Sequence, residues 1–186
     1  MTRAGEMQTT VVLADPPWPH ANGSRTNSGK SPKYQLMKLC EIAALGSTVR
    51  ELAGPNAVLY LWATSPHLPG AIQVIASWGF VYRSVRVWRK ARVACGFWVR
   101  SNAEVVLIAE RGRPLVPPTT DCTIFEADPI VPGAHSSKPA ALHQSIERRW
   151  PAAHKVELFA VRRRSGWSCY GKALGTRLTP IGVARC

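Results

Sequence analysis

Long apolar runs and an N-terminal export signal are both missing from this 186-residue sequence. A membrane-spanning helix needs about 20 predominantly apolar residues, so we expect no transmembrane segment. A secretory signal peptide joins a basic region to an apolar one, and the first residues do not follow that pattern. The sequence therefore predicts an intracellular, cytoplasmic protein.

Cysteine is sparse and irregularly spaced. The five cysteines include no CxxC pair, and the five histidines form no ligand motif. Disulfide frameworks and zinc sites both use clustered, regular spacings. We therefore expect reduced thiols and no bound metal.

Acidic residues are few: 11 Asp and Glu stand against 24 Lys and Arg, which gives a formal net charge of +13. So large a basic excess in a small protein favours a polyanionic partner, and nucleic acid is the first candidate. The basic residues are dispersed rather than gathered on one amphipathic stretch, which disfavours a membrane surface. Charge alone is equally consistent with DNA and with RNA.

The remaining composition is typical of one folded domain over residues 1–186, with 46% hydrophobic and 19% charged residues. Stretches with strand patterns alternate with stretches with helix patterns, which favours an α/β fold with a largely parallel sheet. Three tryptophans in apolar stretches, Trp62, Trp78 and Trp88, are expected in the core. The expected strands are 10–15, 57–62, 80–89, 103–109, 122–125, 155–160 and 167–170, and the expected helices are 36–52 (broken near Gly46), 65–78 and 137–149.

The tetrapeptide Asp15-Pro16-Pro17-Trp18 directly follows the first expected strand. Ligands of open α/β sheets bind beyond the carboxyl ends of the strands. The two prolines fix φ and remove two backbone donors, so nearby carbonyls should face outward with no N–H competing for them. The Asp15 carboxylate and the Pro16 carbonyl would then form a rigid acceptor array beside the aromatic face of Trp18. Taken alone, the tetrapeptide is equally consistent with a simple turn.

This combination of groups suits methylation of an adenine amine, with these four residues as the catalytic set. The lone pair of that nitrogen is delocalised into the ring, and two acceptors against its hydrogens would localise it. A nearby carboxylate favours the positive charge that develops on nitrogen. A base that leaves its stack needs an aromatic partner, which Trp18 can provide. Neither a metal nor a covalent nucleophile is required.

A polar segment over residues 20–33 follows the tetrapeptide and is expected to close over the target. Its basic residues Arg25, Lys30 and Lys33 would meet phosphates of the nucleic acid. Tyr34, at the end of this segment, either contacts the target base or has a structural role.

Two charged residues occupy places that disfavour charge. Lys138 stands at the start of an expected helix, where a cation opposes the helix dipole. Glu157 lies within an apolar strand and needs a partner for its carboxylate. Both are therefore candidates for a functional site, whereas His135 and His143 are expected to be surface or packing residues.

The order of motifs along the chain adds a family resemblance. The sequence resembles the DPPW-type adenine-N6 methyltransferases, the MT-A70 group, and in particular its compact bacterial and phage DNA enzymes. The resemblance implies a Rossmann-like, S-adenosylmethionine-dependent fold in permuted order, with the catalytic motif before the cofactor-binding strand. The motifs that carry it are Asp15 to Trp18, Tyr34 with Met37, 59–64, 78–80, 88–90, 102–104, 111–112, 135–139, Glu147, Pro151, 157–160, 166–167 and Gly171.

The same resemblance implies the cofactor site. Strand 155–160 would be the cofactor strand, with Glu157-Leu158-Phe159 in place of the usual glycine-rich turn. Lys138 would lie in the cofactor or target-base pocket, and Asp15 would also contact the methionine ammonium. The chain departs from the family at Val161, where Arg is common, and at Lys172, where Asn is common. Arg162 and Lys172 are expected to replace those ribose-binding groups.

The sequence therefore predicts transfer of a methyl group from S-adenosylmethionine to the N6 amine of adenine in DNA. Two alternatives stay open, namely the same chemistry on RNA and a non-catalytic nucleic-acid-binding subunit of a methyltransferase complex. Members of the family often dimerise, so a homodimer or a heteromeric partner is also expected.

Overall fold

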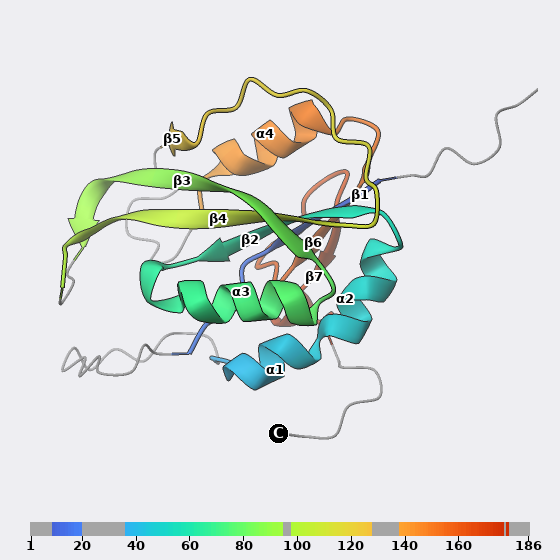
Figure 1. Cartoon of the computed structure of the whole chain (residues 1–186), viewed down its shortest axis with the longest axis horizontal. Helices are drawn as coiled ribbons and strands as arrows, with labels where there is room; N and C mark the ends of the chain where they lie inside the picture. Colours follow the sequence, from blue (N-terminus) through green and yellow to red (C-terminus); the bar gives the residue numbers. More distant parts are fainter. Residues whose placement is uncertain (1–8, 20–35, 95–97, 128–137, 177, 179–186) are drawn as a thin grey trace, which may run out of the picture.

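The computed structural model describes residues 9–19, 36–94, 98–127, 138–176 and 178. These residues build one seven-stranded sheet with helices on both faces (Figure 1). The strands are β1 (Thr10–Ala14), β2 (Ala57–Ala63), β3 (Val81–Ala94), β4 (Ser101–Arg111), β5 (Ile124–Glu126), β6 (His154–Leu158) and β7 (Ser168–Tyr170). The predicted α/β fold is thus confirmed, while the permuted chain order stays a prediction.

The strand order is β5-β3-β4-β2-β1-β6-β7, which places β2 at the centre of the sheet and β1 beside it, between β2 and β6. β1 runs parallel to both β2 and β6, and β7 runs parallel to β6. β4 is antiparallel to β2 and to β3, because β3 and β4 follow each other as a hairpin that needs no helical crossover. β5 is parallel to β3, so among the described strands β4 alone runs against the other six, and the expected largely parallel sheet is confirmed.

Helices cover the two faces unequally. α1 (Leu39–Ala44), α2 (Gly46–Ala53) and α3 (Leu68–Ser77) lie on one face, and α4 (Ala140–Arg149) lies on the other (Figure 1). The predicted interruption near Gly46 is present, since α1 ends and α2 begins there. A single 3-10 turn, η1 (Ser65–His67), leads from β2 into α3, and η2 (Lys172–Leu174) follows β7.

The central strands alternate between two hydrophobic cores. In β1, Val12 and Ala14 belong to the core under α1 to α3, whereas Val11 and Leu13 belong to the core under α4. Every residue of β1 and β2 is buried, which explains why both read as continuous apolar runs in the sequence. Trp62, Trp78 and Trp88 are buried as predicted.

No helix within the described part of the chain is both long enough and apolar enough to cross a bilayer.

Candidate active site

The predicted catalytic tetrapeptide begins at the carboxyl end of β1, an interior strand of the sheet. Asp15 follows β1 directly, and its backbone N–H lies 3.5 Å from the carbonyl of Leu158 at the end of β6. β1, β2, β6 and β7 are mutually parallel, so their carboxyl ends share one edge of the sheet. Asp15 therefore stands between the carboxyl ends of β2 and β6, at the edge where α/β proteins bind ligands.

The expectation that the proline carbonyls have no backbone N–H partner is wrong. The N–H of Trp18 donates to the carbonyl of Pro16 at 2.8 Å, and the N–H of Met37 donates to that of Pro17 at 2.9 Å. The prolines lack donors of their own, but the tight turn brings the N–H of the next residue back onto Pro16. A carbonyl oxygen has two lone pairs, so Pro16 can still accept a second hydrogen bond. The Asp15 carboxylate is nevertheless the principal acceptor of this turn.

Lys138 meets Asp15 from the opposite layer of the fold. Its ammonium lies 3.0 Å from Oδ2 of Asp15 and 3.2 Å from Oε2 of Glu104. Lys138 stands just before α4, where a cation opposes the helix dipole. The two carboxylates compensate that unfavourable position, and they explain why a lysine is stable there.

Two residues at this site, Glu104 and Lys90, had no role predicted for them as individual side chains. β4 pairs with β2 so that Val105 lies opposite Ala63, which brings Glu104 to the carboxyl end of β2. The Lys90 ammonium, on the neighbouring strand β3, contacts the second side of the Glu104 carboxylate. One feature of the sequence could have indicated a role for Glu104: it lies in an apolar strand, where a glutamate needs a charged partner.

Two buried tryptophan side chains, Trp62 and Trp88, pack against the two lysines. Nζ of Lys138 is 5.4 Å from the centre of the Trp62 ring, and Nζ of Lys90 is 5.1 Å from that of Trp88. The two indoles meet edge to face with centroids 6.0 Å apart. The charges therefore alternate along a row (Asp15, Lys138, Glu104, Lys90) above a rigid apolar surface, and their formal sum is zero.

The row of charges shifts the pKa values of its members. Burial raises the pKa of Asp15, and the Lys138 ammonium opposes that rise without cancelling it. Burial also acts to raise the pKa of Glu104, but Lys138 and Lys90 outweigh it, so the pKa of Glu104 lies below its usual range. Burial lowers and the two carboxylates raise the pKa of Lys138, with a net increase. Lys138 therefore stays charged at neutral pH, and Asp15 keeps 38% of its side-chain surface open to a ligand.

The predicted cofactor strand, β6, ends beside Asp15. The Glu157 carboxylate lies 3.2 Å from Nε2 of His143 on α4, which supplies the partner that the sequence demanded. The Leu158 side chain is in the core, so only the backbone of this residue reaches the edge of the sheet. Phe159 adopts φ = 62°, a left-handed conformation that is rare for a bulky residue and that is concentrated at functional sites.

The loops after β6 and β7 touch through their backbones. The Ala160 N–H donates to the Tyr170 carbonyl at 2.9 Å. Arg162 and Lys172, which were expected to replace family ribose ligands, are exposed on these two loops. A Cβ on Gly171 would lie 2.0 Å from the Ala160 carbonyl oxygen, so only glycine permits this approach.

We expect Gly171→Ala to destabilise the protein by about 1–3 kcal/mol, because the new methyl group forces the two loops apart. The change is measured as a shift of the urea unfolding midpoint. Gly166→Ala is the matched control, because no atom lies within 4 Å of its Cβ position and only its positive φ opposes a side chain. Equal effects of the two substitutions would contradict the proposed clash.

The Glu147 carboxylate on α4 anchors the loop after β6. Arg164 donates to it through Nε at 2.6 Å and through Nη2 at 2.9 Å, and Trp167 donates through Nε1 at 2.8 Å. These hydrogen bonds, those of Arg164 above all, lower the pKa of Glu147 to about 2. The bidentate geometry ties the loop that carries Arg162 to α4.

The hydrogen bonds between Arg164 and Glu147 lead to a prediction about stability at acid pH. A carboxyl group whose pKa is lower in the folded than in the unfolded state stabilises the fold above its unfolded pKa, and that stability is lost as the pH falls toward the folded pKa. We therefore expect wild type to exceed Glu147→Gln in stability at pH 7, with the difference shrinking between about pH 5 and about pH 2. Urea midpoints across this range measure it, and a constant difference would refute the assignment.

The predicted phosphate ligands Arg25, Lys30 and Lys33 and the predicted base contact Tyr34 lie outside the described residues, as does His135.

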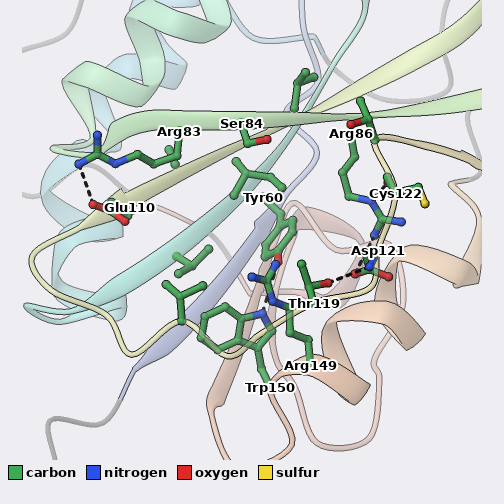
Figure 2. Close-up of a pocket in the computed structure, with 16 residues that line it drawn as sticks. Tyr60, Arg83, Ser84, Arg86, Glu110, Thr119, Asp121, Cys122, Arg149 and Trp150 are labelled. Atoms are coloured by element: carbon green, nitrogen blue, oxygen red, sulfur yellow. Dashed lines mark hydrogen bonds and ion pairs between the residues drawn. The ribbon is translucent and has the colours of Figure 1, made fainter.

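A cavity of about 260 Å³ lies away from Asp15, near the start of β2 and the end of β4 (Figure 2). Its ionic groups pair within the protein: Arg83 with Glu110 at 2.7 Å, and Arg86 with Asp121 at 3.3 Å. Arg149 donates to the Pro117 carbonyl across the cavity's rim. The contacts of Arg86 and Arg149 hold the segment that precedes β5 against the sheet and α4, and the Arg83–Glu110 pair links β3 to β4, so these groups have structural roles.

The fold, with Asp15 at the carboxyl ends of parallel strands, is that of the open α/β proteins, a class in which ligands bind beyond those ends. Comparison with known proteins then gives the family. The MT-A70 family profile matches residues 9–173, and the chain belongs to this family of methyltransferases. MT-A70 methyltransferases generally use S-adenosylmethionine as methyl donor.

Several relatives match over most of this chain. The Type II methyltransferase M.MunI of Mycoplasma sp is 30% identical over 179 residues, which cover 87% of this chain and 76% of that protein. A probable N(6)-adenosine-methyltransferase MT-A70-like protein of Oryza sativa is 26% identical over 95% of this chain and 24% of its own length. The human N(6)-adenosine-methyltransferase catalytic subunit METTL3 is 25% identical over 80% of this chain and 25% of its own length. The chain thus spans about a quarter of the rice and human proteins.

Proposed function

We propose that this chain transfers a methyl group from S-adenosylmethionine to the N6 amine of adenine in DNA. The observation that carries the proposal is the 3.0 Å contact between Lys138 and Asp15, at the edge of the sheet and above the Trp62 ring. It holds a partly open carboxylate in the same turn as the partly exposed Trp18 ring, which suits a planar base with an exocyclic amine. Membership of the MT-A70 family supports the same reaction class.

Asp15 supplies what an adenine amine lacks as a nucleophile. Its carboxylate accepts an amino hydrogen and favours the positive charge that forms on N6 as the new bond develops. Within the described residues Lys138 contacts Asp15 through Oδ2, so the carboxylate is held in one orientation. The second lone pair of the Pro16 carbonyl is the candidate for the other amino hydrogen.

The cofactor is assigned to the edge between β1 and β6. When bound, S-adenosylmethionine supplies an electrophilic methyl group, whose bond to sulfur breaks as the bond to N6 forms. The donor set fits this molecule, because Asp15 and Glu157 present carboxylates to an ammonium and to ribose hydroxyls. Glu157 is oriented by His143, while Arg162 and Lys172 are candidate polar contacts from the loops beyond.

DNA is favoured over RNA by the relationship to M.MunI, the relative of which this chain covers 76%, and whose name marks it as a Type II methyltransferase. The alternative substrate, RNA, is supported by relatives named as adenosine methyltransferases, including the human one. Both substrates fit the excess of basic residues, which gives a net charge of +13. A direct substrate comparison therefore has to separate them.

The test follows transfer of label from methyl-labelled S-adenosylmethionine to duplex DNA, single-stranded DNA and RNA of matched sequence. We expect N6-methyladenine in DNA at a higher rate than in RNA. A faster reaction on RNA would replace the substrate in the proposal and keep its chemistry. No transfer to any of them, together with no heat of S-adenosylmethionine binding in calorimetry, would favour the non-catalytic subunit instead.

A further inference from the structure

A histidine to which the sequence patterns assign no role lies against the predicted catalytic tryptophan. His67 ends η1, the turn that directly follows β2. Its imidazole stacks on the indole of Trp18, with ring centroids 5.7 Å apart and an interplanar angle of 19°. One face of Trp18 is therefore covered by a ring that belongs to the protein.

Both imidazole nitrogens of His67 have partners. Nε2 lies 2.7 Å from the carbonyl oxygen of Pro19, and Nδ1 lies 2.7 Å from the hydroxyl of Thr64. A carbonyl oxygen can only accept a hydrogen bond, so Nε2 must carry the proton. In the neutral ring Nδ1 is then the acceptor for the Thr64 hydroxyl. The Pro19 carbonyl thus sets the tautomer, and the ring is anchored on both sides.

The edge of the Trp18 indole is held as well. Its Nε1–H donates to the carbonyl of Trp62, the penultimate residue of β2, at 3.0 Å. The indole is therefore fixed by a hydrogen bond at its edge and by a stacked ring on one face. Trp18 also packs partly against the core under α1 to α3 and stays partly exposed. Because the imidazole covers one face, a ligand that stacks on this indole can do so only on the face opposite His67.

We propose that His67 is a positioning residue that makes Trp18 a one-sided platform, so that the target adenine stacks on the face opposite the imidazole. The proposal rests on the proposed function. An extruded base needs a stacking partner that is already in place, because ordering a mobile indole during binding would cost conformational entropy. His67 does not touch the base in this arrangement. It acts through Trp18 and through its hydrogen bond to Pro19, which holds the chain directly after the tetrapeptide.

Three substitutions separate the ring from the hydrogen bond. His67→Ala removes both, His67→Gln keeps a donor for the Pro19 carbonyl without a ring, and His67→Phe keeps a stacking ring without a donor. His154→Ala is the matched control, since this exposed histidine lies at the start of β6 and contacts Ser168. Each variant is assayed with the nucleic acid that wild type methylates best, and its S-adenosylmethionine affinity is measured by calorimetry.

We expect His67→Ala to lower kcat/KM for the nucleic acid roughly tenfold while S-adenosylmethionine affinity stays within about twofold of wild type. His67→Gln should resemble the alanine variant, His67→Phe should recover part of the loss, and His154→Ala should match wild type. Unchanged kcat/KM in His67→Ala would overturn the proposal, and so would rescue by glutamine but not by phenylalanine.

The tautomer gives a readout that needs no substrate. Long-range ¹H–¹⁵N correlation spectra of the wild-type protein should place the His67 proton on Nε2, and the opposite tautomer would overturn the proposed geometry. Absence of methyl transfer by wild type would remove the proposed function, and the role of His67 with it. Normal transfer by wild type and His67→Ala alike would remove the role of His67 alone.

Discussion

Replacing Asp15 should reduce methyl transfer more than any other single change in this chain. Removing one preorganised electrostatic group from a transition state costs about 10²–10³ in rate. We expect Asp15→Asn, which keeps one acceptor oxygen but loses the charge, to fall about 100-fold, and Asp15→Ala, which loses both, about 1000-fold. Initial rates with labelled S-adenosylmethionine measure the effect.

The fold should survive the loss of Asp15, because Lys138 keeps its contact with Glu104 at 3.2 Å. Circular dichroism and urea unfolding of the variants check this. Glu110→Gln is the matched carboxylate control, since Glu110 pairs with Arg83 on β3 and lies opposite Val58 near the start of β2. Rates within a few-fold of wild type for Asp15→Ala would contradict the assigned role.

The largest loss of stability is expected from Lys138→Met. Methionine fills a similar volume, but it leaves Asp15 and Glu104 without the cation between them. Breaking a fully buried ion pair from one side typically costs about 3–5 kcal/mol. Here solvent reaches Asp15, whose side chain is 38% exposed, and Lys90 still contacts Glu104, so the cost is reduced. We therefore expect a decrease at the lower end of that range, about 3 kcal/mol, in the free energy of unfolding at pH 7. Methyl transfer should be lost as well.

The pH dependence of the stability of Lys138→Met tests whether the unpaired carboxylates cause its loss of stability. Burial raises the pKa of Asp15, and Lys138 is the group that lowers it, so the pKa rises further in Lys138→Met. An acid whose pKa is higher in the folded than in the unfolded state binds protons on folding, so stability increases as the pH falls through the folded pKa. The deficit of Lys138→Met relative to wild type should therefore shrink on acidification from pH 8 to pH 5.

A second buried lysine provides the comparison. Lys155 donates to the carbonyls of Pro151 and Ala153 at 3.2 and 3.0 Å, and no carboxylate among the described residues pairs with it. Lys155→Met should lose stability through those two hydrogen bonds, and its deficit should not shrink on acidification in this way. Parallel pH profiles for the two methionine variants would show that the carboxylates do not cause the Lys138 effect.

Local patterns in the sequence were sufficient to predict most of the helices and strands. β1 and β2 are short apolar runs followed by Asp15 and Thr64, and burial on both faces of a sheet produces that pattern. Strand ends were less predictable. β3 continues to Ala94, beyond the expected end at Arg89, because pairing with β4 supplies hydrogen-bond partners that no local pattern encodes.

The carbonyls of Pro16 and Pro17 show why the expectation of outward-facing, unpaired carbonyls failed. The prolines at 16 and 17 do lack donors, as the sequence implied. Whether their carbonyls face outward depends on where the next N–H groups fall, and those of Trp18 and Met37 fall on them. Met37 lies across a segment outside the described residues, so its contact with Pro17 could not follow from the spacing of residues.

The chemical types at the site were readable from the sequence, whereas their partners were not. Asp15 stood out because it follows an apolar strand, at the edge where ligands of α/β sheets bind. Lys138 before a helix and Glu157 inside a strand stood out because a charge is unfavourable in both places. The partners Glu104, Lys90, His67 and His143 come from other elements, and contacts such as Lys138 with Glu104 exist only once β4 pairs antiparallel with β2 and α4 packs across it. Strand register and helix packing follow from burial of the whole core, which no local stretch of sequence contains.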